Sequence, residues 1–129
     1  MQDKPDMADL MQAVQDFVGE EIAPQLTGHV AFSARVAGNV LALMQRELDL
    51  GSRFRAAQQA RLEALLNQTG TLEVLNRILC EKIAKGALGP NDEALMDHLK
   101  RATMGKLAID QPTYAGYQIA QTNGWPEEG

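Results

Sequence analysis

The chain has 129 residues, with 12 Lys or Arg against 17 Asp or Glu, so its formal charge is −5, and 45% of its residues are hydrophobic. This length and apolar content suit one domain with a hydrophobic core. The acidic balance, the lack of a Lys- or Arg-rich run and the few aromatic residues argue against nucleic acid or an anionic membrane surface as a partner. Because no segment resembles a membrane span or an export signal, we expect a soluble cytoplasmic protein.

Residues that favour helices dominate, since Ala and Leu far outnumber Val and Ile, and no window alternates with a period of two. The sequence therefore predicts an all-α fold, a single up-and-down bundle of about five antiparallel helices. In chain order, the first predicted helix begins after the N-cap Asp6, with Asp9 three residues on, and ends near Ala23 because of Pro24. The second runs from about His29 to Leu50 and is stopped by Gly51, and the third follows the cap Ser52 and ends at about residue 66. The fourth follows the cap Thr71 and ends before Gly86, and the fifth runs from about 91 to about Asp110, before Pro112. We expect residues 1–112 to form the bundle domain and residues 113–129 a partly mobile tail.

Sequence signatures of catalysis are missing. The sequence has no glycine-rich phosphate loop, no G-x-S-x-G motif and no H-E-x-x-H motif. The Glu-x-x-His pairs of a di-iron bundle are missing too, because Leu95 stands three residues before His98. We therefore expect no catalytic residue, metal site or cofactor in this chain. His98 is expected at the surface or boundary of the fold, and Cys80 as a small buried hydrophobic residue.

Three polar residues of the second predicted helix, Arg35, Asn39 and Arg46, fall within roughly 40° of one another at about 100° per residue. We call this group the polar ladder. Three interpretations stay open: a solvated face, pairing with acidic side chains of the first helix, or recognition of carboxylates or phosphates by two guanidinium groups that flank an amide. The polar ladder is thus a candidate surface for a partner or a ligand.

A second polar group is predicted to lie inside the fold. Glu47 projects into the apolar arc of its helix, and Lys106 and Asp110, four residues apart, fall near the middle of the apolar arc of the last helix. Buried charges must be paired, so we predict a buried cluster of Glu47, Lys106 and Asp110, closed by the hydroxyl of Tyr114. This cluster has a structural interpretation and, as the alternative, a role as a ligand site.

A family resemblance is carried by four segments, QDKPDMADLMQAVQDFV (2–18), FSARVAGNVLALMQREL (32–48), LNRILCEKIAKG (75–86) and KLAIDQPTYA (106–115). The chain resembles a family of small all-helical bacterial proteins of unknown function. Members occur beside, or fused to, kinases of the aminoglycoside-phosphotransferase type in acyl-CoA catabolism. The resemblance covers about residues 2–117, and Thr113 stands where a basic residue is expected. The family pattern is strongest at Arg35, Asn39, Arg46, Glu47, Lys106, Asp110 and Pro112.

The resemblance implies a non-catalytic accessory subunit and supplies no catalytic residue. In the 4-hydroxy acid branch, which includes levulinate breakdown, it implies the small partner of a kinase that phosphorylates a 4-hydroxyacyl-CoA. Such a kinase brings its own nucleotide site, base and metal ligands, so the small subunit needs only a shaped surface. Two alternatives stay open. One is a small acyl-CoA or acyl-chain binding protein, with Arg35 and Arg46 on the phosphates, and the other is a homodimeric scaffold without a ligand.

Overall fold

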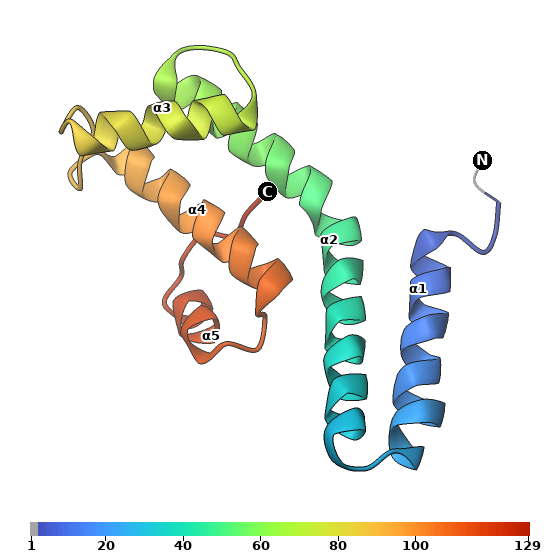
Figure 1. The fold of residues 1–129 in the computed structure, drawn as a ribbon. Helices are drawn as coiled ribbons and strands as arrows, with labels where there is room; N and C mark the ends of the chain where they lie inside the picture. The colour runs from blue at the N-terminus through green and yellow to red at the C-terminus, as the bar shows by residue number, and fades with distance from the viewer. Residues whose placement is uncertain (1–2) are drawn as a thin grey trace. The chain divides into compact units, whose positions relative to one another are not determined.

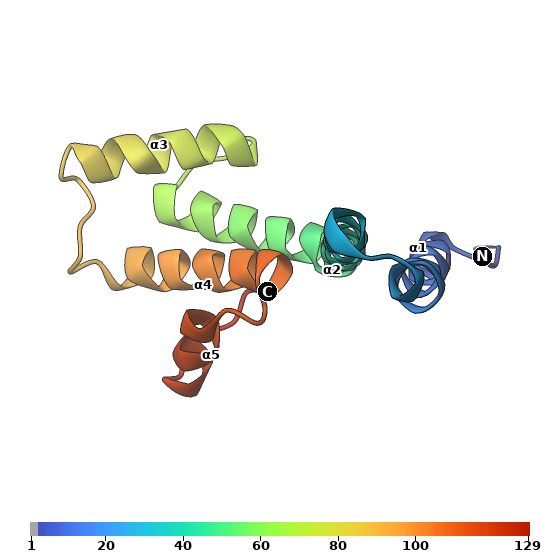
Figure 2. The same cartoon turned by 60° about the horizontal axis from the view of Figure 1, so that its bottom comes forward.

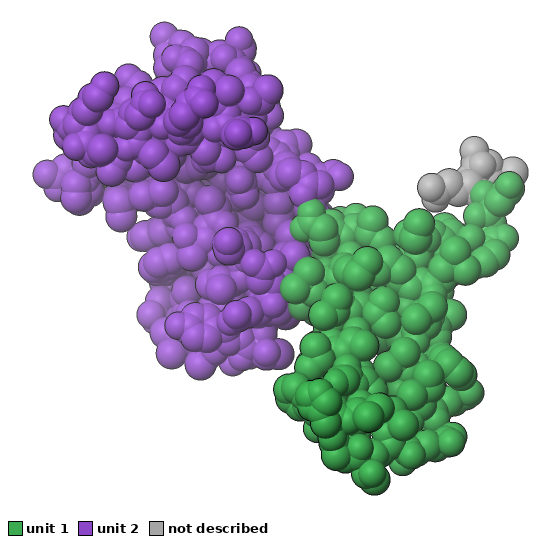
Figure 3. All heavy atoms as spheres, viewed as in Figure 1, with its two compact units in different colours: residues 1–49 green, residues 50–129 purple. Residues whose placement is uncertain are grey.

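The computed structural model describes residues 3–129, and the regular secondary structure in this range is helical, without strands (Figure 1). The elements in chain order are α1 (Met7–Asp16), a π-helical turn η1 (Phe17–Ile22), a 3-10 turn η2 (Ala23–Gln25), α2 (Gly28–Leu66), α3 (Leu72–Ala84), α4 (Glu93–Asp110) and α5 (Ala115–Thr122). The predicted all-α class is confirmed. The chain divides into two compact units, unit 1 (Met1–Asp49) and unit 2 (Leu50–Gly129) (Figure 3). Helix α2 contributes residues to both.

Unit 1 is a helical hairpin in which α1 and the first part of α2 lie side by side and run in opposite directions (Figures 1 and 2). Asp6 caps α1 as predicted. Its carboxylate accepts a hydrogen bond from the Asp9 N–H (2.9 Å), and the Asp9 carboxylate accepts one from the Asp6 N–H (3.1 Å). Beyond α1 the predicted helix does not continue unchanged to Pro24, because the backbone widens at Phe17 into η1 and tightens into η2 before the chain reverses.

Unit 2 gathers the second part of α2 together with α3 and α4, which both lie alongside it (Figures 1 and 2). The three helices share a leucine core made of Leu62, Leu66, Leu75, Leu79 and Leu95. Thr71 caps α3 as predicted, since its hydroxyl accepts the N–H of Val74 (3.2 Å). Gly86, with a φ of 77°, follows the end of α3 in the left-handed conformation that the sequence predicts for this glycine.

About five helices were expected and five α-helices lie in residues 3–129, but they are not the same five. The predicted stop at Gly51 is wrong, because the helices expected on either side of it form the continuous 39-residue α2. A helical glycine costs only about 1 kcal/mol relative to alanine, and Gly51 is buried, so packing outweighs its low helix propensity. The fifth helix, α5, falls within residues 113–129. The domain boundary at residue 112 and the mobility of the tail stay predictions.

Candidate functional site

The buried residues of α4 show whether the predicted polar cluster lies inside the fold. Its buried residues are Leu95, His98, Met104, Gly105 and Ile109. Lys106 and Asp110 each follow a buried residue, so they are turned about 100° away from the inner face. Both are exposed, and Tyr114 is 53% exposed. The prediction that these three residues belong to a buried cluster is therefore wrong.

The error comes from the helix phase. The predicted apolar arc, with Lys106 and Asp110 near its middle, included Leu99 and Thr103, which are both exposed, whereas His98 and Gly105 lie on the inner face. A histidine and a glycine contribute little to an apolar pattern, so periodicity alone placed the arc one residue too far along the chain. Glu47, the remaining member of the predicted cluster, is half-buried in unit 1.

The polar ladder lies on the part of α2 that belongs to unit 1. Arg35 and Asn39 are exposed, and Arg46 is half-buried. Arg35 and Asn39 are therefore accessible to water and to a partner. Their role in recognition stays a prediction.

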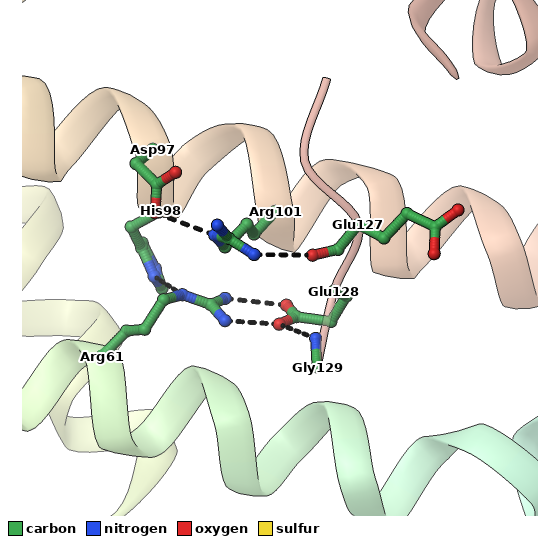
Figure 4. A network of polar contacts seen from close by, with 7 residues as sticks. All are labelled: Arg61, Asp97, His98, Arg101, Glu127, Glu128 and Gly129. Atoms are coloured by element: carbon green, nitrogen blue, oxygen red, sulfur yellow. Dashed lines mark hydrogen bonds and ion pairs between the residues drawn. The ribbon is translucent and has the colours of Figure 1, made fainter. Parts of the chain in front are cut away.

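Unit 2 contains a polar network around Glu128 that the sequence analysis did not predict (Figure 4). Arg61 of α2 forms a two-pronged ion pair with the Glu128 carboxylate, and its Nη2 donates to Oε2 at 2.7 Å. The Glu128 side chain is fully buried, while 20% of the Arg61 side chain is exposed. The Nε of Arg61 donates to Nδ1 of His98, at 3.2 Å. Arg61 therefore bridges α4 and the segment that carries Glu128.

We call residues 125–129, which have no helical structure, the strap. A second arginine holds it: Arg101 donates from Nη1 to the backbone oxygen of Glu127 (3.0 Å) and from Nε to the Asp97 carboxylate (2.9 Å). The ammonium group of Lys100 lies 5.3 Å from the ring centre of Trp125, within the range of a cation–π contact. Three side chains of α2 and α4 thus fix three successive parts of the strap.

Gly105 leaves the space that Glu128 occupies. A Cβ atom at this position would lie 2.7 Å from Cγ and 2.8 Å from Cβ of Glu128, which is closer than carbon atoms approach. The buried position of Gly105 on α4 therefore has a steric reason. Any larger residue must push the strap out of its place between α2 and α4.

We expect Gly105→Ala to lower the free energy of unfolding by about 2 kcal/mol, the usual cost of overpacking a tight site. Gly116→Ala is the matched control, because a Cβ there would meet the Tyr114 ring at 2.5 Å, but that exposed side chain can turn away. The control should change stability by only about 0.5 kcal/mol, as surface substitutions do. Urea unfolding followed by circular dichroism measures both, and equal losses in the two variants would contradict the steric role of Gly105.

The pKa is lowered in both titratable partners of Arg61, His98 and Glu128. Burial and the nearby positive charge of Arg61 lower the pKa of His98 below its ordinary 6.5, against a weaker opposite pull from Glu128 and Asp97. Burial would raise the pKa of Glu128, but the hydrogen bonds from Arg61 and from the Gly129 N–H, with the Arg61 charge, hold it below 4.5. At neutral pH, His98 is uncharged and accepts through Nδ1, while Glu128 is ionised.

These directions predict how stability depends on pH. Below about pH 6.5 the unfolded chain binds a proton at His98 that the folded chain does not, so the free energy of unfolding falls as the pH decreases through this range. A second loss follows below pH 4.5, where unfolded Glu128 takes a proton first. We expect His98→Asn, which keeps an acceptor near the Nδ1 position, to flatten the first of these two losses. His29→Asn is the control, and urea midpoints between pH 7 and 5 that fall equally in both variants would contradict the role of His98.

Sequence analysis missed this network because its partners are distant in the chain: Glu128 follows Arg61 by 67 residues. Two of its expectations are corrected here. His98 is buried with 3% exposure, where a surface or boundary position was expected, and Cys80 is exposed, where burial was expected. The available signal was the seven-residue spacing of His98 and Gly105, which places both on one face of α4.

Unit 1 has an exposed apolar surface. We call its members the apolar stripes: Met7, Leu10, Val14 and Phe17 on the first arm of the hairpin, and Phe32, Val36, Val40, Met44 and Leu48 on α2. These side chains are 43% to 61% exposed, whereas the apolar side chains buried in the described part of unit 1 are Met11 and Ala31. The stripes meet at a hollow of about 360 Å³, lined by Met7, Met11, Leu43, Met44, Glu47 and Leu48. The hairpin therefore leaves most of its apolar side chains uncovered.

Comparison with known proteins gives one family. Within residues 3–129, no helix combines the length and apolar character needed to cross a bilayer, and no three His, Cys, Asp or Glu side chains are grouped as metal ligands. No curated protein and no solved structure matches the chain. A family model described as a domain of unknown function (DUF6285) matches residues 24–114, which is more than half of the sequence. The chain therefore belongs to the DUF6285 family.

Proposed function

We propose that this chain is a non-catalytic accessory subunit that docks on a kinase of the aminoglycoside-phosphotransferase type acting on a hydroxyacyl-CoA, and that the apolar stripes form the docking surface. The observation that carries this proposal is the exposure of large apolar side chains along both arms of the unit 1 hairpin. The identity of the partner comes from the family resemblance, in which such kinases are the neighbours or fusion partners.

The energetics of the hairpin support a covered state. Two helices joined by a turn gain most of their stability from packing an apolar face, and here that face points outward. Monomeric proteins rarely expose contiguous apolar patches larger than a few hundred Å² unless the patch binds something. Burying one large apolar side chain contributes roughly 1.5 to 3 kcal/mol, so covering several at once provides enough free energy for a stable complex.

The polar ladder fits the same surface. Arg35 and Asn39 each precede a valine of the α2 stripe, so at about 100° per residue they point toward one flank of the stripe, next to Val36 and Val40 in the sequence. Interfaces commonly place an apolar centre inside a polar rim, and arginine is enriched there because it pairs with carboxylates in two-pronged geometry. We propose that the ladder forms one rim of the docking surface and pairs with acidic groups of the kinase.

The experiment is co-expression with a tagged kinase of this type from the same genome. The proposal predicts that this chain is retained with the kinase through affinity capture and gel filtration in a fixed ratio. It also predicts that the kinase expressed alone is aggregated or poorly active, because its own matching surface is then uncovered. A kinase that is stable and fully active alone, with no bound copy of this chain, would reject the proposal.

A second candidate function is acyl-chain binding, and the hollow in unit 1 is the observation that favours it. Its lining of methionines and leucines suits an alkyl chain, and methionine side chains adapt to irregular apolar ligands. A thermal shift assay with medium-chain acyl-CoA esters separates the two functions. Ligand at about 100 times its Kd stabilises a protein by about 2.7 kcal/mol, so an unchanged Tm at high excess would reject this candidate.

A further inference from the structure

We infer that the groove between α2 and α4 in unit 2 is a binding site for an extended, glutamate-bearing peptide segment, and that the strap occupies it as an exchangeable ligand. This site lies outside the docking surface proposed for unit 1 and does not depend on it. The kind of ligand that it binds is inferred from the groups that contact Glu127 and Glu128.

The groove is organised by contacts that do not involve the strap. His98 accepts a hydrogen bond from Nε of Arg61, which leaves both terminal nitrogens of the guanidinium facing the carboxylate (Figure 4). Asp97 accepts from Nε of Arg101 in the same way, which leaves Nη1 for a backbone carbonyl. Each arginine is therefore held by one partner on α4 and presents its free edge to the bound segment. A receptor whose groups are already oriented loses less entropy on binding.

The strap itself has the properties of a bound peptide. It lacks regular secondary structure, and its described polar contacts with the helices are made by one carboxylate and one backbone oxygen. The backbone oxygen carries no sequence information, so the buried carboxylate of Glu128 supplies the specificity. Gly105 of α4 lies against the Cβ and Cγ atoms of Glu128, and a side chain at this position would take the space that these two atoms occupy.

The space next to the strap has room for residues other than those of the strap beside the bound glutamate. A cavity of about 180 Å³ adjoins the strap and is lined in part by Arg53, Phe54 and Tyr117. A competing segment with a larger residue next to its glutamate could use this space, and Arg53 would pair with a further acidic group. The site therefore takes acidic peptides as a class, with one glutamate as the required element.

A tethered ligand competes strongly with a free one. A segment attached by a short linker has an effective concentration in the millimolar range, so free peptide at micromolar concentration should not displace the strap from the wild-type chain. The site becomes measurable when the strap is removed or loses its carboxylate. Two variants serve this purpose, a chain that lacks residues 125–129 and the full-length Glu128→Ala variant.

The probe is a labelled, amidated peptide of sequence NGWPEEG, which repeats residues 123–129, and the readout is fluorescence anisotropy. We expect it to bind the chain without the strap, and we expect the NGWPEQG peptide, which lacks the Glu128 charge, to bind at least about tenfold more weakly, as the loss of a charge-assisted hydrogen bond predicts. Adding Arg61→Met to the strapless chain should abolish binding. Equal binding of both peptides, or no binding to a strapless chain that keeps its helical circular dichroism, would overturn the inference.

The Glu128→Ala variant keeps the test decisive if the strapless chain does not fold. Trp125 is the only tryptophan of the sequence and lies in the strap, so its emission reports whether the strap is docked. Trp125 emission should already be shifted to the red in this variant, and the labelled tryptophan-free peptide NGFPEEG should bind to it, while labelled NGFPEQG should not. The absence of this difference in a folded variant would overturn the inference as well.

Discussion

Arg61→Met is expected to lower the free energy of unfolding by about 3 kcal/mol and to release the strap. Removing one partner of a buried ion pair leaves an uncompensated charge, which costs about 3 to 5 kcal/mol. The lower end applies here because part of the Arg61 side chain reaches water, and because undocking of the strap returns Glu128 to solvent. Urea unfolding measures the loss, and a red shift of Trp125 emission in native buffer reports the release.

The double variant Arg61→Met with Glu128→Met makes this prediction specific. Replacing both members of a buried pair by apolar residues of similar volume is often neutral or stabilising, so the double variant should recover most of the lost stability. Arg77→Met, at an exposed position on α3, is the matched control and should change stability by only about 0.5 kcal/mol. If Arg61→Met and Arg77→Met behave alike and Trp125 emission does not move, the ion pair does not hold the strap.

The second large effect concerns the docking surface. We expect Val40→Glu to weaken the proposed complex with the kinase about 100-fold, or about 2.7 kcal/mol, because it places a charge at the centre of the α2 stripe, and central interface positions carry effects of this size. The unfolding free energy of the free chain should hardly change, since Val40 is 50% exposed. Titration of the kinase with the variant, followed by calorimetry, gives the affinity.

Ile83→Glu is the control for this substitution. It introduces the same charge at another exposed apolar position, which lies on α3 in unit 2 and is 39% exposed. This variant should bind the kinase with wild-type affinity. If Ile83→Glu lowers the affinity as much as Val40→Glu, the loss comes from the added negative charge and not from its position on the α2 stripe. If Val40→Glu causes no loss, the α2 stripe is not part of the interface.

The features that could be predicted from the sequence are those that depend on neighbouring residues. The Asp6 cap with Asp9, the Thr71 cap and the left-handed Gly86 all follow from side chains within a few positions of the backbone groups they satisfy. The end of α4 before Pro112 has an equally local cause, because a proline restricts the residue that precedes it. The all-α class could be predicted from composition, because Ala and Leu favour helices and outnumber Val and Ile.

The features that could not be predicted depend on tertiary packing. Gly51 continues a helix because it is buried, which no local preference indicates. The phase of α4 follows from Gly105 and His98, whose inward positions make sense only once Glu128 and Arg61 are present beside them. The strap that contacts α2 and α4 lies in a segment that the sequence marks only as a tail.

We propose above all that this chain docks on a kinase and contributes no catalytic residue. Sedimentation velocity of a mixture of the two separately purified proteins tests it most directly. The proposal predicts one faster species that contains both chains, and its loss with Val40→Glu. Two species that sediment independently at micromolar concentrations, together with a kinase whose kcat and KM are unchanged by added chain, would contradict it.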